Sequence, residues 1–170
     1  DYSNQVQVIL MQPVSLTLGQ PEGDFDQGGM FEVTVSMDNP APVAGLELHL
    51  QDNPESVTLV DAQSTGVIEG TGTVSINDYD NEGIVLWFDF TGYMIEEYAG
   101  HILTLTFQVN EDAPDNEVID LELSDMSTIS DNQGNAHPLN SNSVQFTTGV
   151  PEVFMSLVQI SDTQFEIHME

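Results

Sequence analysis

Three acidic segments that contain glycine carry oxygen-rich side chains at spacings that suit a hard cation. The candidate ligands are Asp24 and Asp26 in DFDQGG, Asp78, Asp80 and Glu82 in DYDNEG, and Asp131 and Asn135 in DNQGN. Calcium binds several carboxylate and amide oxygens at once, and D-x-D-x-[D/N/E]-G is the first half of a typical calcium loop. The segments therefore predict calcium as a cofactor and indicate no other.

The DYDNEG segment has a second interpretation. The residues that follow it, Ile84–Phe90, are nearly all apolar and predict a strand, whereas a helix follows the calcium loop of an EF-hand. A run of Asn, Glu and Gly also suits a solvated hairpin turn, because Asn and Gly adopt positive φ at low cost. A calcium loop and a plain hairpin turn are both compatible with this segment.

The histidines do not form a metal-binding or catalytic pattern. They are His49, His101, His137 and His168, and no two of them have the spacing of a zinc ligand pair. His49 falls in the polar register of its strand, which predicts a surface position. The sequence also lacks G-x-S-x-G, so no serine nucleophile is indicated. We therefore expect a protein that is not an enzyme.

The charge excludes several classes of partner. The chain has no Lys, Arg or Cys, and its 29 Asp and Glu give a formal charge of −29. Binding to nucleic acid or to anionic lipid needs cationic side chains, and disulfides need Cys. No stretch of about 18 apolar residues predicts insertion into a membrane. Salt and millimolar calcium would screen the self-repulsion, so we expect an extracellular or cell-surface location.

Short strands dominate the hydropathy pattern. Apolar and polar residues alternate over Phe31–Met37, Leu46–Leu50, Ile102–Val109 and Val118–Leu123, and shorter apolar runs include Val67–Ile68. Ile84–Phe90 is almost continuous and predicts a central strand covered on both faces. The pattern predicts an all-β sandwich of the jelly-roll type. We expect its core to surround Trp87, Phe88, Phe90, Leu105 and Phe107.

The pattern divides the chain into three parts. Residues 1–13 predict an N-terminal strand or extension, 14–150 a β-sandwich, and 151–170 a C-terminal strand extension. The order VSLTLGQ then MFEVTVSM near the start recurs as MSLVQIS then QFEIHME at the end. Residues 151–170 are therefore either a donor strand or the start of a second repeat.

The region from Val14 to Thr147 resembles the cohesin modules of secreted scaffolding proteins. The resemblance rests on VSLTLG, on GGMFEVTVSMDNPAPVAGLELHL with its N…VAG corner, on ILTLTFQVNEDAPDNEVIDLEL and on SDMSTISDNQGNAHPL. It implies a cohesin-like β-sandwich with extra terminal strands. It also implies binding rather than catalysis, since cohesins hold dockerin modules and related folds occur in surface and filament proteins.

The apolar terminal segments suggest how such a module could assemble. The residues predicted to make subunit contacts are Val6, Val8, Leu10, Phe154, Leu157, Val158, Ile160, Phe165 and Ile167. An unpaired strand edge attracts another chain, and head-to-tail strand addition builds an open fibre. We therefore expect a homopolymer, as the subunit of a fibre, sheath or surface layer. The alternatives are a monomeric cohesin that binds a dockerin-like partner and, less favoured, a carbohydrate-binding module.

Overall fold

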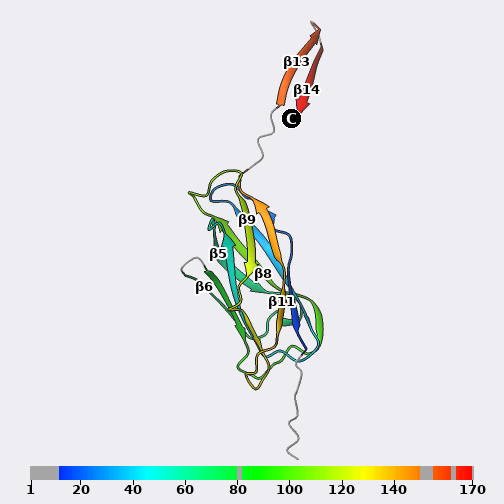
Figure 1. The fold of residues 1–170 in the computed structure, drawn as a ribbon. Helices are drawn as coiled ribbons and strands as arrows, with labels where there is room; N and C mark the ends of the chain where they lie inside the picture. The colour runs from blue at the N-terminus through cyan, green and yellow to red at the C-terminus, as the bar shows by residue number, and fades with distance from the viewer. Residues whose placement is uncertain (1–11, 80–81, 150–154, 162–163, 170) are drawn as a thin grey trace, which may run out of the picture.

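The protein is built from strands. The computed structural model describes residues 12–79, 82–149, 155–161 and 164–169. Within those ranges it contains fourteen strands and one short 3-10 helix (Figure 1). Twelve of the strands form one mixed and one antiparallel sheet, and the last two form a small sheet of their own. The predicted all-β sandwich is confirmed.

The first sheet has the strand order β11-β1-β3-β8-β5. Its members are β11 (Leu139–Ser141), β1 (Val14–Leu18), β3 (Met30–Asn39), β8 (Tyr98–Val109) and β5 (Val57–Ser64), and the short β2 (Glu22–Gly23) pairs with β3. β1 and β11 are parallel, and the other pairs in this sheet are antiparallel. The first strand of the sandwich therefore lies beside one of its last strands along one edge of this sheet.

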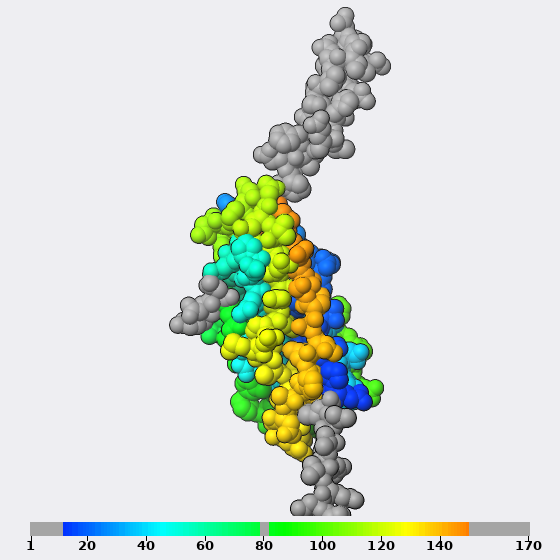
Figure 2. Space-filling view, viewed as in Figure 1, coloured from blue at the N-terminus to red at the C-terminus, as the bar shows by residue number. Residues whose placement is uncertain are grey.

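The second sheet has the order β12-β9-β4-β7-β6 and is antiparallel throughout. Its members are β12 (Ser143–Thr147), β9 (Val118–Leu123), β4 (Gly45–Asn53), β7 (Glu82–Phe88) and β6 (Thr73–Tyr79), and β10 (Thr128–Ser130) pairs with β4. Figure 2 shows the yellow and orange segments that contain β9 and β12 side by side on the surface, in agreement with their pairing.

The inward residues of both sheets form one core. Strand alternation places side chains on opposite faces in turn, so each strand contributes every second residue. Phe31 and Phe107 stack at 5.4 Å between ring centroids, and Trp87 is 1% exposed. Trp87 Nε1 donates a hydrogen bond to Thr71 O at 3.2 Å, which satisfies its only polar atom. Trp87, Leu105 and Phe107 are core residues, as predicted.

Two expectations about strands are wrong. β7 ends at Phe88 and its residues alternate between buried and half-buried, so it is not covered on both faces. Phe90 is 89% exposed, because the chain leaves the sheet at Asp89, whose carboxylate accepts from the backbone N–H groups of Thr91 and Gly72. Residues 67–68 belong to the 3-10 helix η1 (Gly66–Ile68), where Gly66 has φ of 59°.

The last two strands pair with each other. β13 (Met155–Ser161) and β14 (Gln164–Met169) form an antiparallel two-stranded sheet with an irregularity near Gln159. Of the predicted subunit contacts, Leu157, Val158, Ile160, Phe165 and Ile167 lie on these strands. Val6, Val8, Leu10 and Phe154 lie outside the described residues. Among the residues described, no helix is long and apolar enough to cross a membrane.

Candidate functional site

The outer surface of the second sheet brings apolar and acidic side chains together. We call it the β7 face and define it by the outward residues of β9, β4, β7 and β6: Asp120, Glu122, Glu47, His49, Gln51, Glu82, Ile84, Leu86, Phe88, Thr73, Ser75 and Asn77. Register sets these residues in rows across the strands. One row runs Glu47–Leu86–Ser75 and the next His49–Ile84–Asn77.

An apolar ridge runs along the centre of this face. Ile84, Leu86 and Phe88 are half-buried residues that point away from the core. The ridge continues past the strand end, because the Phe90 ring packs edge-on against Phe88 with centroids 4.7 Å apart. Phe90 also lines a hollow of about 460 Å³ with Tyr93. The ridge offers aromatic and aliphatic surface that a partner could cover.

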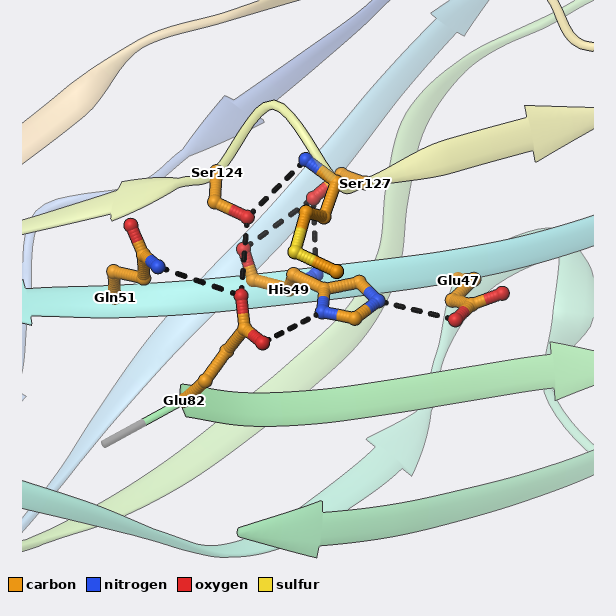
Figure 3. Close-up of polar contacts among 7 residues, drawn as sticks. Glu47, His49, Gln51, Glu82, Ser124 and Ser127 are labelled. Carbon is orange, nitrogen blue, oxygen red and sulfur yellow. Dashed lines mark hydrogen bonds and ion pairs between the residues drawn. The ribbon is translucent and has the colours of Figure 1, made fainter. Parts of the chain in front are cut away.

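The polar centre of the face is His49. Its Nε2 lies 3.0 Å from Glu47 Oε1, and its Nδ1 lies 3.0 Å from Glu82 Oε2. Figure 3 shows the ring lying between these two carboxylates, with Glu82 also turned toward Ser124 and Gln51. Ser124 Oγ donates to Glu82 Oε1 at 3.1 Å. The side chain of His49 is only 6% exposed and that of Glu82 16%, whereas that of Glu47 is 48% exposed.

The loop between β9 and β10 is tied to the backbone of His49. The N–H of His49 donates to Ser127 Oγ at 2.9 Å, and Ser127 Oγ donates in turn to His49 O at 3.3 Å. The N–H of Ser124 donates to the same carbonyl at 2.8 Å. Register in the strand therefore turns His49 outward, but the neighbouring carboxylates and this loop bury it. The prediction that His49 is a surface residue is wrong.

The two carboxylates favour the charged form of His49. Burial of the ring lowers its pKa, but the hydrogen bonds and negative charges of Glu82 and Glu47 together outweigh that effect, so the pKa of His49 is raised. Correspondingly, the hydrogen bond from His49 holds the pKa of Glu82 below its usual range. The cluster therefore favours a positive charge on His49, between one largely buried and one half-exposed carboxylate.

The residues predicted to bind calcium are held by hydrogen bonds within the protein. Asp131 Oδ1 accepts from the N–H groups of Gln133 and Asn135, and Asn135 Nδ2 donates to Asp131 Oδ2 at 2.9 Å. Asp78 Oδ2 accepts from the N–H of Leu59. No group of three or more His, Asp or Glu residues that could hold a metal ion occurs in the described part of the chain.

Of the remaining predicted ligands, Asp24 Oδ1 accepts from the N–H of Asp26 across a tight turn. Asp80 lies outside the described residues. Glu82 belongs to β7 and points to His49 rather than into a turn. β6 and β7 are antiparallel neighbours, and Tyr79 pairs with Glu82 on either side of the two residues that the structure does not describe.

The other histidines contribute less to the face. His101 is exposed in β8, on the first sheet. His137 is 7% exposed beside a hollow of about 260 Å³, and neither of its ring nitrogens has a hydrogen-bond partner among the described residues. His168 lies on β14. One sign of the His49 cluster is visible in the sequence, since Glu47 and His49 stand two residues apart and share a face, but no sequence pattern points to Glu82.

A model of the cohesin domain matches residues 14–146, which span β1 to β12. The chain belongs to the cohesin family. No curated protein sequence matches this cohesin. The fold is similar to that of solved cohesins from bacteria and an archaeon.

The sixth cohesin of scaffoldin B from Acetivibrio cellulolyticus, solved in complex with a Cel5 dockerin, is 16% identical with a TM-score of 0.61, and the match covers 81% of this cohesin and 100% of that chain. A non-cellulosomal cohesin from the archaeon Archaeoglobus fulgidus is 19% identical with a TM-score of 0.60, and the match covers 83% of this cohesin and 94% of that chain. The cohesin CaCohA2 from Clostridium acetobutylicum is 16% identical with a TM-score of 0.61, and the match covers 81% of this cohesin and 92% of that chain. Identities this low establish the fold alone.

Proposed function

We propose that this cohesin domain is a non-enzymatic docking module, located outside the cell, that binds a dockerin-like partner through its β7 face. The observation that carries the proposal is the apolar ridge formed by the half-buried, outward Leu86 and Phe88 of β7 and by the exposed Phe90 just beyond the strand end. Exposed apolar surface on a soluble module is costly unless a partner covers it. Dockerins are partners of several cohesins of similar fold.

The charge of the face indicates the chemistry of that partner. Glu47 pairs with Leu86 of the ridge, whereas Glu122 and Asp120 lie on β9 beside Gln51 and Asn53, towards the other end of the face. The chain has no Lys or Arg to offset these charges. A partner that meets this surface must supply cationic side chains, because like charges facing each other across an interface cost several kcal/mol. We therefore expect the partner to combine apolar anchors with Lys or Arg at the rim.

A matched pair of variants tests the face. Leu86→Glu places a charge at the centre of the ridge, and Thr104→Glu places the same charge at a central outward position of the first sheet. Titration calorimetry with a panel of calcium-loaded dockerin modules should show affinity reduced about 30-fold or more by Leu86→Glu, as expected for loss of a hot spot. Thr104→Glu should bind like the unmodified chain.

The thermal midpoint of each variant must stay close to that of the unmodified chain for this comparison to hold. Equal losses in both variants would place the interface elsewhere. Loss in Thr104→Glu alone would place it on the first sheet. Absence of binding to any dockerin, together with saturable binding of a glycan, would favour the carbohydrate-binding alternative.

Self-assembly is the second candidate function. Among the described residues, β13 and β14 pair only with each other, and an isolated two-stranded sheet is marginal in water. Another copy could stabilise this hairpin by adding a strand. Sedimentation of the full chain and of a chain lacking residues 151–170, in calcium and in chelator, tests this function. Concentration-dependent polymers that disappear with the deletion would support it, and monomers of both chains would exclude it.

A further inference from the structure

His49 is the one side chain of the β7 face, as far as the structure describes it, that can carry a positive charge. We propose that doubly protonated His49 is the positioning residue of this face, and that loss of its proton rearranges Glu47, Glu82 and the β9–β10 loop. The consequence for partner binding rests on the proposed function. The rearrangement itself does not.

The argument begins with the two ring nitrogens. Each lies 3.0 Å from a carboxylate oxygen, Nε2 from Glu47 and Nδ1 from Glu82. The contact of Nε2 with Glu47 is a hydrogen bond, and the contact of Nδ1 with Glu82 is an ion-pair distance without the geometry of a hydrogen bond. A ring that carries a proton on each nitrogen attracts both carboxylates. A neutral imidazole has only one N–H. Whichever tautomer it adopted, a lone pair would face a carboxylate inside a site that is almost closed to water.

All charged groups around the ring have the same sign. Glu47 approaches from the same strand and Glu82 from β7, while the β9–β10 loop contributes the neutral Ser124 and Ser127. The carboxylates of Glu122 and Asp125 line a hollow beside Gln51, and neither forms an ion pair with His49 among the described residues. Among the described residues, no other cationic side chain contacts these carboxylates.

Loss of the proton must therefore move atoms. Glu82 is largely buried and also accepts from Ser124, so its departure breaks the contact that joins β7 to the loop. Glu47 is half exposed and can turn into solvent. Both movements disturb the surface that lies beside the ridge at Ile84 and Leu86, since these residues share rows with His49 and Glu47.

Two opposing effects then act on a cationic partner. The face becomes more negative by one charge, which at about 10 Å in a water-like medium strengthens attraction by about twofold. It also loses the charge-assisted hydrogen bonds that fixed its shape, and one such bond is worth about tenfold or more. The second effect is larger. We therefore expect affinity to fall about fivefold as pH rises through the pKa of His49.

The first experiment uses the free chain and needs no partner. Nitrogen-15 spectra of the histidine rings and nuclear Overhauser spectra of the chain are recorded from pH 5 to pH 10. Both ring nitrogens of His49 should be protonated at neutral pH, with a midpoint above the ordinary value of about 6.5. The nuclear Overhauser contacts of the His49 ring with Ser124 and Ser127 should weaken with the same midpoint, which a change of charge without movement of the loop would not cause.

Conservative variants identify the partners of the ring. Glu82→Gln keeps the size of the side chain but removes its charge, so it should lower the midpoint of His49. Glu47→Gln should lower it less, because Glu47 is more exposed. His101→Gln, a substitution on the first sheet, is the matched control and should leave the His49 titration unchanged. These variants retain His49 and the loop, which limits the risk of unfolding.

Three outcomes would overturn the inference. A midpoint at or below about 6.5 would mean that the carboxylates do not hold the proton. Nuclear Overhauser contacts with the loop that do not change as His49 titrates would mean that it positions nothing. A dockerin bound equally well on both sides of the midpoint would remove the link to binding. Failure to find any dockerin would instead count against the proposed function, and the spectra of the free chain would still decide the role of His49.

Discussion

The two outer faces of the sandwich are made by the same strand geometry but from different residues. On the first sheet the central cross-strand pairs are Glu32 with Thr106 and Thr34 with Thr104, so polar side chains meet water there, and the exposed Met30 lies beyond them at the end of β3. On the second sheet the corresponding central pair is Glu47 with Leu86, beside His49 with Ile84. Short hydroxyl side chains need no further cover. The apolar ridge and the His49 cluster of the second sheet would gain further burial from a bound partner.

This difference distinguishes the inward residues, which folding requires, from the outward residues, which are available for binding. The inward residues of both sheets serve one core and are equally buried, so folding makes the same demand on the two sides. The outward residues are free of that demand. The proposed function explains their contrast by placing the binding surface on one side, and four predictions test this explanation.

The largest effect on stability is expected from the buried Trp87, in contrast to the exposed Phe90 that follows it closely in the chain. Trp87→Ala should lower the free energy of unfolding by about 3–5 kcal/mol, because it leaves a cavity in the core. Phe90→Ala, three residues further along, should change it by about 0.5 kcal/mol or less, because Phe90 is 89% exposed. Urea denaturation measures both. A comparable loss in Phe90→Ala would show that the exposed ring has a folding role.

The second effect concerns pH and His49. The folded-state pKa of His49 is raised, so its stabilisation is complete below the unfolded value of about 6.5 and is lost as pH rises through the folded-state pKa. At pH 6, His49→Gln should unfold more easily than the unmodified chain by about 1.5–3 kcal/mol. The gap should narrow toward pH 9. A gap independent of pH would indicate packing rather than charge.

The third effect compares equivalent acids on the two faces. Glu122→Gln on β9 and Glu32→Gln on β3 each remove one exposed negative charge. For a cationic partner on the β7 face, we expect only Glu122→Gln to weaken binding, by about twofold, mainly through the association rate. Surface plasmon resonance at low and high salt measures this. Equal effects of both substitutions would mean that only net charge matters.

The smallest effect is expected from calcium. With a formal charge of −29, the chain should gain thermal stability from any cation, because screening reduces self-repulsion. If the acidic loops bind calcium as the sequence predicts, calcium should raise Tm slightly more than sodium chloride of equal ionic strength, and Asp131→Asn should reduce this excess. Differential scanning calorimetry tests it. Identical curves would leave calcium as a screening ion.

The sequence predicted the parts of the fold that depend on local periodicity. Alternation placed Val33, Leu48 and Leu105 inside correctly, because a strand gives every second residue the same environment. The prediction was wrong for Phe90, because a run of apolar letters does not show that Asp89 ends the strand by capping a turn. The His49 cluster depends on register between β4 and β7, which are about 35 residues apart, and hydropathy carries no information about register.

The parallel pairing of β1 with β11 also affects how the module is made. Val14 lies beside Leu139, and the side chain of Asn142 bonds both the N–H and the carbonyl of Leu18, so the first strand is completed only by the last part of the domain. During translation, Val14 leaves the ribosomal exit tunnel long before Leu139 is synthesised. During synthesis β1 can pair with β3 but keeps its other edge open, so the nascent module stays unfinished until translation has passed the final strands.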